Sequence, residues 1–489
     1  MTAKLITPCL TALLVIATGN IQARDAIDSL PNLGSSSVQY LSHKQAEQLG
    51  QAFIRQARSQ LKFIDDPILL EYLNRVGNRL VRFSDNPENG PTRYSFYLID
   101  NPKINAFAVP GGHIAIHTGL ILNAESEAEL AAVLAHEIAH ITQNHTARNI
   151  ENNRFDNVIA LASVLVAAAA GSAEAAQASL LASNASILER RLAYGRNFER
   201  EADANGIRTL SKAGYNTTAM VSFFQKLLNS SRLNSNNAPE FLLTHPLTIS
   251  RISEAEQRAK SYPIVANPPD TDFLNIKARI TASFGDNYKR HRKLLAQQLA
   301  SKTSTEKNAA AAQYYQYGLT LARANQYENS INALETAINL EPETLQYRIA
   351  LADVELESGN SFTGLNRLRR LYDSHHKQNE YIGLYYANAL ILTRNSLDAI
   401  PILREAIRRT PNDPSAHIML SRAYGETDQL FNSYVARAEY HYLRGSFEFS
   451  IKQLDNAIAL APNQVQKSIL QSKRGKIQTE LDELKKALR

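Results

Sequence analysis

Residues 126–142 read SEAELAAVLAHEIAHIT, and this stretch decides how the first half of the chain folds. Ser126 with Glu129 forms the capping-box pattern that begins a helix, and apolar residues follow at helical spacing. The helix carries the motif HEIAH at 136–140 among leucine, alanine and isoleucine neighbours. Because unpaired charges in such apolar surroundings are costly, the pattern favours a functional site. The alternative is a surface helix that carries two histidines and a glutamate without a function.

The motif at 136–140 has the chemistry of a zinc site. Four residues make about one helical turn, so His136 and His140 project from the same face of the helix. Two neutral imidazoles one turn apart suit a tetrahedral zinc ion. Glu137 lies next to the first histidine, where it can accept a proton from water that the ion activates. The sequence therefore predicts a zinc-binding helix.

A second predicted helix supplies a third candidate ligand. The segment 198–213 has a helical pattern, and Gly214 follows where a C-terminal cap glycine is expected. Glu199 and Asp203 are four residues apart and share a face of this helix, whereas Glu201 points away from them. A carboxylate from this helix completes a site of two histidines and one glutamate, with one position left open for water.

Two alternating segments before the metal helix predict a small sheet. Residues 94–99 and 113–117 alternate in the manner of strands, and the sequence PGG at 110–112 indicates a turn. We expect the two segments to be neighbouring strands. The strand at 113–117 is expected to line the cleft, where an extended substrate would pair with its edge. Its histidines, His113 and His117, are expected to be ordinary strand residues rather than ligands.

The sequence pattern changes from about residue 311, where small and aromatic residues recur at the spacing of a 34-residue helix–turn–helix unit. Pro342 and Pro411 lie 69 residues apart, about two units, and Pro462 follows 51 residues later, about one and a half. These positions resemble the tetratricopeptide repeat family over roughly 311–465, with four units and one odd helix. Such arrays form a curved α-solenoid whose concave face holds peptides or partner proteins. The alternative is that the array only packs against the first domain.

The first 23 residues have the pattern of a secretory signal. Lys4 is the only charge before Arg24, Leu10–Ala17 is a short apolar core, and Ala23 ends a tolerable cleavage site. The one cysteine, Cys9, lies within this segment. The mature chain would then have no thiol, which suits an oxidising compartment. These features predict export to the periplasm.

Composition and charge bear on two further classes of function, nucleic-acid binding and membrane insertion. The net charge of +6 is mild for 489 residues, and no basic stripe carries interleaved aromatics, so nothing indicates a nucleic-acid partner. An alanine-rich apolar region at 158–188 is interrupted by Gly171, and its pieces are short for membrane spans. We expect buried or interfacial helices there. The alternative is a peptidase embedded in the membrane.

Separated motifs together resemble the gluzincin peptidase family that includes HtpX and the prenyl-protein endopeptidases. One is HExxH at 136–140 followed by ExxxD at 199–203, another is Asn105–Ala108 with two glycines just before a strand, and the last is Thr244-His245-Pro246. The resemblance covers roughly residues 45–260. It implies a zinc-dependent peptidase whose fold class is mainly α, with a small sheet, followed here by the α-solenoid.

The resemblance implies a role for each site residue. His136, His140 and Glu199 would bind one Zn²⁺ ion per chain, and Glu137 would be the general base. Asp203 would orient a histidine ligand or, as is sometimes assigned in the family, act as a catalytic proton donor.

His245 has two interpretations. It forms a structural His-Pro turn, or it reaches the zinc ion or a group near it and occupies the open position. As such a regulatory fourth ligand it would make the resting enzyme latent.

Export, a metallopeptidase domain and tetratricopeptide repeats together resemble the periplasmic proteases of Gram-negative bacteria that assist β-barrel assembly. The resemblance implies partners, which are unfolded or misassembled outer-membrane barrel proteins and the barrel-assembly machinery, and it is compatible with peripheral membrane contact. It also implies chaperone-like activity. The alternative is a non-proteolytic periplasmic chaperone or scaffold that uses the repeats. Glu137 favours the protease, because a purely structural metal site does not need it.

The expected domain organisation follows from these features. The predicted domains are a signal peptide at 1–23, a zinc metallopeptidase domain at 24–266, a helical linker at 267–310, tetratricopeptide repeats at 311–465 and a C-terminal helix at 466–489.

Overall fold

The structure is a computed structural model, and it describes residues 42–85, 91, 93–146, 148, 195–233, 239–266, 270–284, 288–300, 306–375 and 379–487. The expected signal peptide and the apolar region at 158–188 lie outside the described residues. Among the described helices, none combines the length and the apolar character that a membrane crossing requires.

A sheet of four strands forms in the first half of the described chain, in the order β1-β2-β4-β3. The strands are β1 (Phe63–Ile64), β2 (Ser95–Ile99), β3 (Ala106–Val109) and β4 (His113–His117). β2 and β4 run parallel, with Ser95 opposite His113 and Ile99 opposite His117, so the expected neighbouring strands are confirmed. Gly111 and Gly112 form the turn between β3 and β4 with φ angles of 85° and 84°, which favour glycine.

The expectation that a substrate would pair with the edge of residues 113–117 is wrong. β4 lies between β2 and β3, so both of its sides are already paired. The glycine turn folds residues 106–109 back onto β4 as an antiparallel neighbour, which makes β3 the strand at this end of the sheet.

Helices cover both faces of the sheet. The helices of the first half are α2 (His43–Gln60), α3 (Pro67–Phe83), α4 (Thr118–Asn123), α5 (Glu127–Thr142), α10 (Arg196–Lys212), α11 (Thr218–Leu233), α12 (Phe241–Thr244), α13 (Ile249–Lys260) and α14 (Thr271–Ser283). α5 begins where the sequence predicts, because the Ser126 side chain accepts a hydrogen bond from the Glu129 amide.

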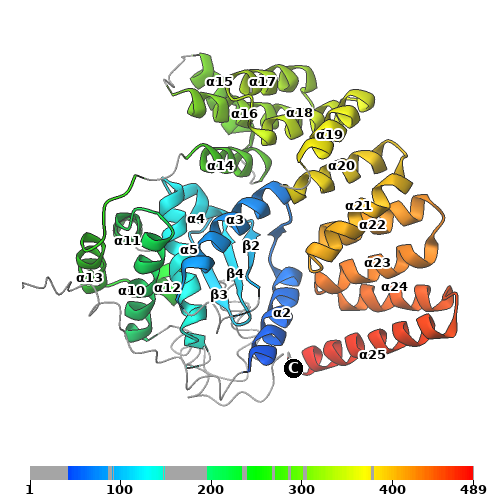
Figure 1. Cartoon of the computed structure of the whole chain (residues 1–489), viewed down its shortest axis with the longest axis horizontal. Helices are drawn as coiled ribbons and strands as arrows, with labels where there is room; N and C mark the ends of the chain where they lie inside the picture. The colour runs from blue at the N-terminus through cyan, green and yellow to red at the C-terminus, as the bar shows by residue number, and fades with distance from the viewer. Residues whose placement is uncertain are drawn as a thin grey trace, which may run out of the picture.

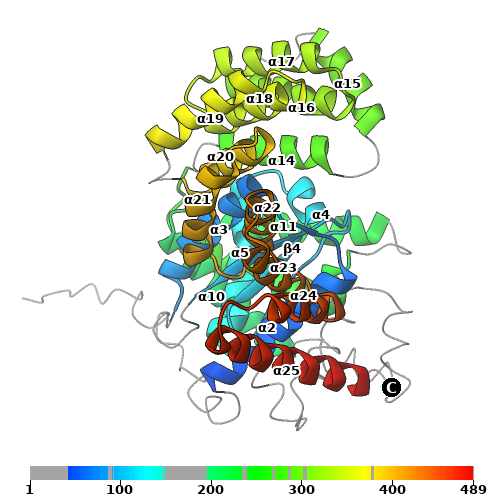
Figure 2. The same ribbon diagram turned by 90° about the vertical axis from the view of Figure 1, so that its right-hand side faces the viewer.

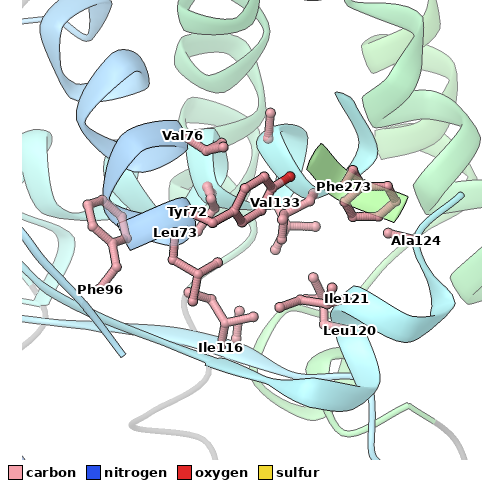
Figure 3. Packing of buried hydrophobic residues seen from close by; sticks show 14 of the residues in the cluster. Tyr72, Leu73, Val76, Phe96, Ile116, Leu120, Ile121, Ala124, Val133 and Phe273 are labelled. Carbon is pink, nitrogen blue, oxygen red and sulfur yellow. The ribbon is translucent and has the colours of Figure 1, made fainter. Parts of the chain in front are cut away.

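Every residue of α5 is buried, so the helix runs through the middle of the core. Figure 3 shows side chains of α3, the sheet, α4, α5 and α14 converging there, among them Tyr72, Phe96, Ile116, Val133 and Phe273. A helix enclosed on all sides holds its two histidines rigidly, which suits a metal site.

The second half is a solenoid of antiparallel helices. They are α15 (Tyr288–Ala300), α16 (Lys307–Arg323), α17 (Tyr327–Leu340), α18 (Leu345–Glu357), α19 (Ser361–His375), α20 (Glu380–Leu392), α21 (Ser396–Arg409), α22 (Pro414–Glu426), α23 (Leu430–Leu443), α24 (Phe447–Ala459) and α25 (Gln464–Ala487). Three of these helices lie between Pro411 and Pro462, which accounts for the spacing of one and a half units. The expected fold class is confirmed.

The solenoid curves around the first domain (Figure 1). α15–α19 lie over one end of the domain, α20–α24 descend along one side, and α25 returns to α2; Figure 2 shows the same stack from that side. Where the solenoid meets the domain, Arg279 of α14 contacts Asp66 of the domain and also Tyr315 and Tyr385 of the solenoid. The solenoid is therefore joined to the domain through a buried charged group as well as through apolar contacts.

Candidate metal centre

Four buried side chains from three parts of the fold meet at one point. His136 and His140 come from α5, Glu199 from the first turn of α10, and His245 from the residue after α12. One ligand atom of each lies within 4.8 Å of the other three, and each residue is only 1% exposed. The structure therefore brings together the three predicted ligands and places His245 beside them.

The distances in this cluster fit a tetrahedral metal ion. His136 Nε2 lies 3.0 Å from His140 Nε2 and 3.3 Å from His245 Nδ1. Glu199 Oε1 lies 3.1 Å from His245 Nδ1 and 3.5 Å from His140 Nε2. Four donors bound tetrahedrally to zinc lie about 3.3 Å from one another, since each bond is about 2.0–2.1 Å. Imidazole and carboxylate are also ligands that zinc accepts.

Glu137 lies beside the cluster and is completely buried. Neither carboxylate oxygen makes a well-formed hydrogen bond within the described residues, although the Ala108 amide favours the ionised carboxylate. His245 Nε2 is 3.5 Å from Glu137 Oε1. Burial raises the pKa of Glu137 above its ordinary value. A carboxylate that has a raised pKa and whose oxygens are not engaged in well-formed hydrogen bonds is suited to receive a proton.

Asp203 contacts the other nitrogen of a candidate ligand. Its Oδ1 lies 3.1 Å from His136 Nδ1, and Arg251 donates two hydrogen bonds of 2.8 Å to the same carboxylate. Burial opposes ionisation, but the hydrogen bonds with His136 and Arg251 outweigh it and lower the pKa of Asp203. With Nε2 on a metal, Nδ1 of His136 carries the proton and donates to Asp203, which orients the ring.

The charges around His136 also act on its proton. Burial disfavours the imidazolium, but hydrogen bonds to Asp203 and Glu199 outweigh it and raise the pKa of His136 to about 9. Metal binding through Nε2 must therefore displace a proton.

Sequence reasoning missed two groups that support the cluster. Arg251 of α13 donates to Asp203 and also lies 2.8 Å from Glu199 Oε2, so it fixes both carboxylates. His145 Nδ1 lies 2.8 Å from His140 Nδ1, and its Nε2 lies 3.1 Å from Glu201 Oε2. Spacing along one helix does not reveal either group, because one comes from α13 and the other follows the end of α5.

The strand histidines lie apart from the cluster. His113 Nδ1 accepts from or donates to the Tyr97 hydroxyl at 3.0 Å, and the ring of His117 packs edge-on against Phe107. Burial lowers the pKa of each imidazole to about 4. They are buried neutral residues of the sheet, in line with the expectation.

A glycine lets the two metal-binding helices approach each other. A Cβ atom at Gly206 of α10 would lie 3.3 Å from the backbone nitrogen of His136 and 3.0 Å from Met220 Cε. The position is two turns beyond Glu199, on the side of α10 that faces α5. The absence of a side chain here sets how closely Glu199 and Asp203 are held against the histidines.

Comparison with known proteins agrees with this geometry. The family model described as peptidase family M48 matches residues 67–259, and a tetratricopeptide repeat model matches 313–344. The Beta-barrel assembly-enhancing protease of Escherichia coli (strain K12) is 32% identical over 439 residues, which cover 88% of each chain. The protein of the same name from Yersinia pestis is 34% identical over 440 residues, which cover 89% of this chain and 88% of the relative.

The chain belongs to peptidase family M48, among the beta-barrel assembly-enhancing proteases. A mitochondrial metalloendopeptidase, OMA1 of Schizosaccharomyces pombe, is also 30% identical over 186 residues, which cover 38% of this chain and 52% of the relative. This M48 peptidase is thus a metalloendopeptidase with a repeat domain for protein partners.

Proposed function

We propose that this M48 peptidase is a zinc-dependent endopeptidase of the periplasm that degrades misfolded or stalled outer-membrane β-barrel proteins and assists barrel assembly. The relatives' names support the barrel substrates. The signal-like sequence at 1–23 supports the location. The observation that carries the chemistry is the cluster of His136, His140 and Glu199 with buried Glu137 beside it.

The residues of the site divide the work of peptide hydrolysis. His136, His140 and Glu199 would hold the ion, which, when bound, acidifies water and polarises the peptide carbonyl. Glu137 takes the proton from the attacking water and passes it to the leaving amine. Asp203 and Arg251 orient the His136 ring and keep the Glu199 carboxylate in place. Of the two roles considered for Asp203, orientation fits its contacts best.

The edge of the sheet offers a place for an extended substrate. β3 ends the sheet next to α5, and the amide of Ala108 acts on the Glu137 carboxylate. A polypeptide that added to β3 as a further strand would pass the general base with its backbone extended. Main-chain pairing of this kind requires little sequence specificity, which suits an enzyme for misfolded proteins.

Metal content tests the site directly. We expect about one zinc per chain in the purified mature protein by elemental mass spectrometry, and none in His136→Ala. Glu137→Gln should keep the zinc but lose cleavage of an unfolded substrate by a factor on the order of 10² or more. A protein without bound metal, or an active Glu137→Gln variant, would refute the proposed mechanism. The non-proteolytic scaffold would then be the better explanation.

His245 would keep this centre latent. Its Nδ1 lies within 3.3 Å of His136 and Glu199 ligand atoms, where a fourth ligand would stand, and a substrate must displace it to reach the ion. We expect His245→Ala to retain zinc and to cleave an unfolded substrate faster per bound zinc than the wild type. Thr244→Ala, a change in the same loop, serves as the control. Unchanged or slower cleavage in the zinc-loaded His245→Ala variant would contradict latency and leave the structural turn.

A further inference from the structure

A cleft of about 1340 Å³ lies between the peptidase domain and the solenoid, away from the metal centre. Its walls are α2, α3, the start of β2, α20 and the connection from α21 to α22. In Figure 1 this is the region where α2 and α3 face α20–α22. Sites between domains are common places for ligands, and this volume exceeds the range of about 300–1,000 Å³ typical of small-molecule pockets.

The lining of the cleft is strongly basic. Eight of its residues are lysine or arginine and three are aspartate or glutamate, whereas the whole chain has 53 and 47. Arg75, Arg79 and Arg82 of α3 follow one another at helical spacing, so they form a row along one wall. Two members of the row are held by aromatic rings, Arg75 at 5.2 Å from Tyr72 and Arg79 at 4.6 Å from Tyr215.

Several of these cations lack a neutralising partner. Arg79, Arg82 and Arg93 form no ion pair with any described residue. Four of the eight cations do have a carboxylate partner, and these pairs are Arg58 with Asp65, Arg75 with Asp272, Lys212 with Asp85 and Arg409 with Glu405. Arg93 lies two residues before β2 and donates a hydrogen bond of 3.4 Å to the main-chain carbonyl of Arg409, so its side chain reaches toward the solenoid. The cleft therefore presents fixed positive charge on the side of the peptidase domain.

We propose that this cleft binds an acidic stretch of polypeptide, rich in aspartate and glutamate, as a second contact for the substrate. Guanidinium groups match carboxylates in geometry and charge. Gly111, at the β3–β4 turn, lines the cleft and lies three residues from Ala108 beside Glu137. A chain held in the cleft is thus near the end of the edge strand. The proposal rests on the proposed function for the identity of the substrate, whereas binding of a peptide to the cleft does not require the metal chemistry.

Peptide binding tests the proposal in the full-length mature protein with Glu137→Gln, which prevents cleavage of the probe. The probe is a fluorescein-labelled ten-residue peptide of alternating Glu and Ser, compared by anisotropy with a Gln and Ser peptide of equal length. We expect the acidic peptide to bind at least tenfold more tightly. Arg79→Gln, Arg82→Gln and Arg93→Gln together should weaken it by a factor on the order of ten.

A matched triple variant controls for net charge. Lys452→Gln, Lys467→Gln and Lys476→Gln remove the same charge from α24 and α25 and should leave the affinity unchanged. Thermal melting verifies that each variant is folded. Equal affinity for the two peptides, or equal losses in the two triple variants, would overturn the proposal. So would binding to phosphatidylglycerol vesicles without binding to the acidic peptide, since that would assign the cleft to a lipid surface.

Discussion

Three buried carboxylates around one metal centre have different environments, and those environments separate their roles. Glu199 and Asp203 both contact the guanidinium of Arg251. Burial opposes ionisation of both, but contacts with His245, His136 and His140 lower the pKa of Glu199, and hydrogen bonds with His136 and Arg251 lower the pKa of Asp203. Glu137 lacks a guanidinium partner among the described residues, and burial raises its pKa. A permanently ionised group suits metal binding or the orientation of a ring, whereas a group with a raised pKa suits proton transfer.

His145 is the residue whose removal should reveal a supporting role most clearly. When His140 binds a metal through Nε2, its Nδ1 carries the proton and donates to His145 Nδ1, 2.8 Å away. Loss of such a contact typically weakens metal binding about 10–100-fold. We expect this loss in His145→Leu, measured by competition with a chelator. In His145→Asn the side-chain oxygen replaces Nδ1, so the loss should be smaller. Wild-type affinity in the leucine variant would contradict the role.

At this scale the sequence predicts some residues and misses others for a physical reason. His136, Glu137 and His140 are found because they recur at one turn of a single helix, and Glu199 because it lies on a second helix with a partner four residues away. Arg251 is not found, because an arginine that neutralises two distant carboxylates leaves no periodic signal. The structure brings it to them only through the packing of α13 on α10.

At the scale of elements, the pair α5 and α10 is the frame of the site. Gly206 allows their close approach, because any side chain there would meet the backbone of His136. We expect Gly206→Val to lower the free energy of unfolding by about 1–3 kcal/mol through overpacking, and to weaken zinc binding because the helices separate. Urea denaturation and the chelator competition measure the two effects.

An exposed helical glycine provides the control. A Cβ at Gly475 of α25 would meet no atom within 4 Å, so Gly475→Ala should raise stability by about 0.5–1 kcal/mol without affecting zinc. Equal effects of the two changes would show that the close approach of α5 and α10 is not needed.

Helices were predicted better than strand pairing. The capping serine of α5 and the glycine after α10 are local signals, and the structure confirms both helices. No local signal gives the position of β4 within the sheet, because that position depends on which strands pair with its two edges. Alternation shows that residues 113–117 form a strand but not that β3 covers one side of it.

At the scale of the whole molecule, the solenoid and the peptidase domain share one core. Ile349, Leu368 and Ile382 of the solenoid belong to the same buried cluster as α3 and α5. Periodicity predicts the repeats but not this shared core, since each repeat could equally have packed only on its neighbours. Because the core is shared, removal of the solenoid would expose part of the peptidase core. The expected boundaries at 266 and 311 remain predictions.

Arg279 is the charged group at this junction, where it contacts Asp66, Tyr315 and Tyr385. Removing one partner of a buried ion pair leaves the other uncompensated and costs about 3–5 kcal/mol. We expect Arg279→Met to show a loss of this size in urea denaturation. Arg474→Met breaks an exposed pair with Asp455 and should cost less than about 1 kcal/mol. Similar losses in both variants would show that the junction rests on apolar contacts alone.

The contact between Arg55 of α2 and Glu480 of α25, at 2.7 Å, joins residues that are 425 positions apart. During synthesis the chain emerges from its N-terminus, so α2 appears long before its partner. The contact can form only after nearly the whole chain has emerged, and closing so long a loop carries an entropic cost that the intervening folded helices must reduce. The order of folding is thereby constrained: α2, one of the earliest helices to appear, completes its contacts last.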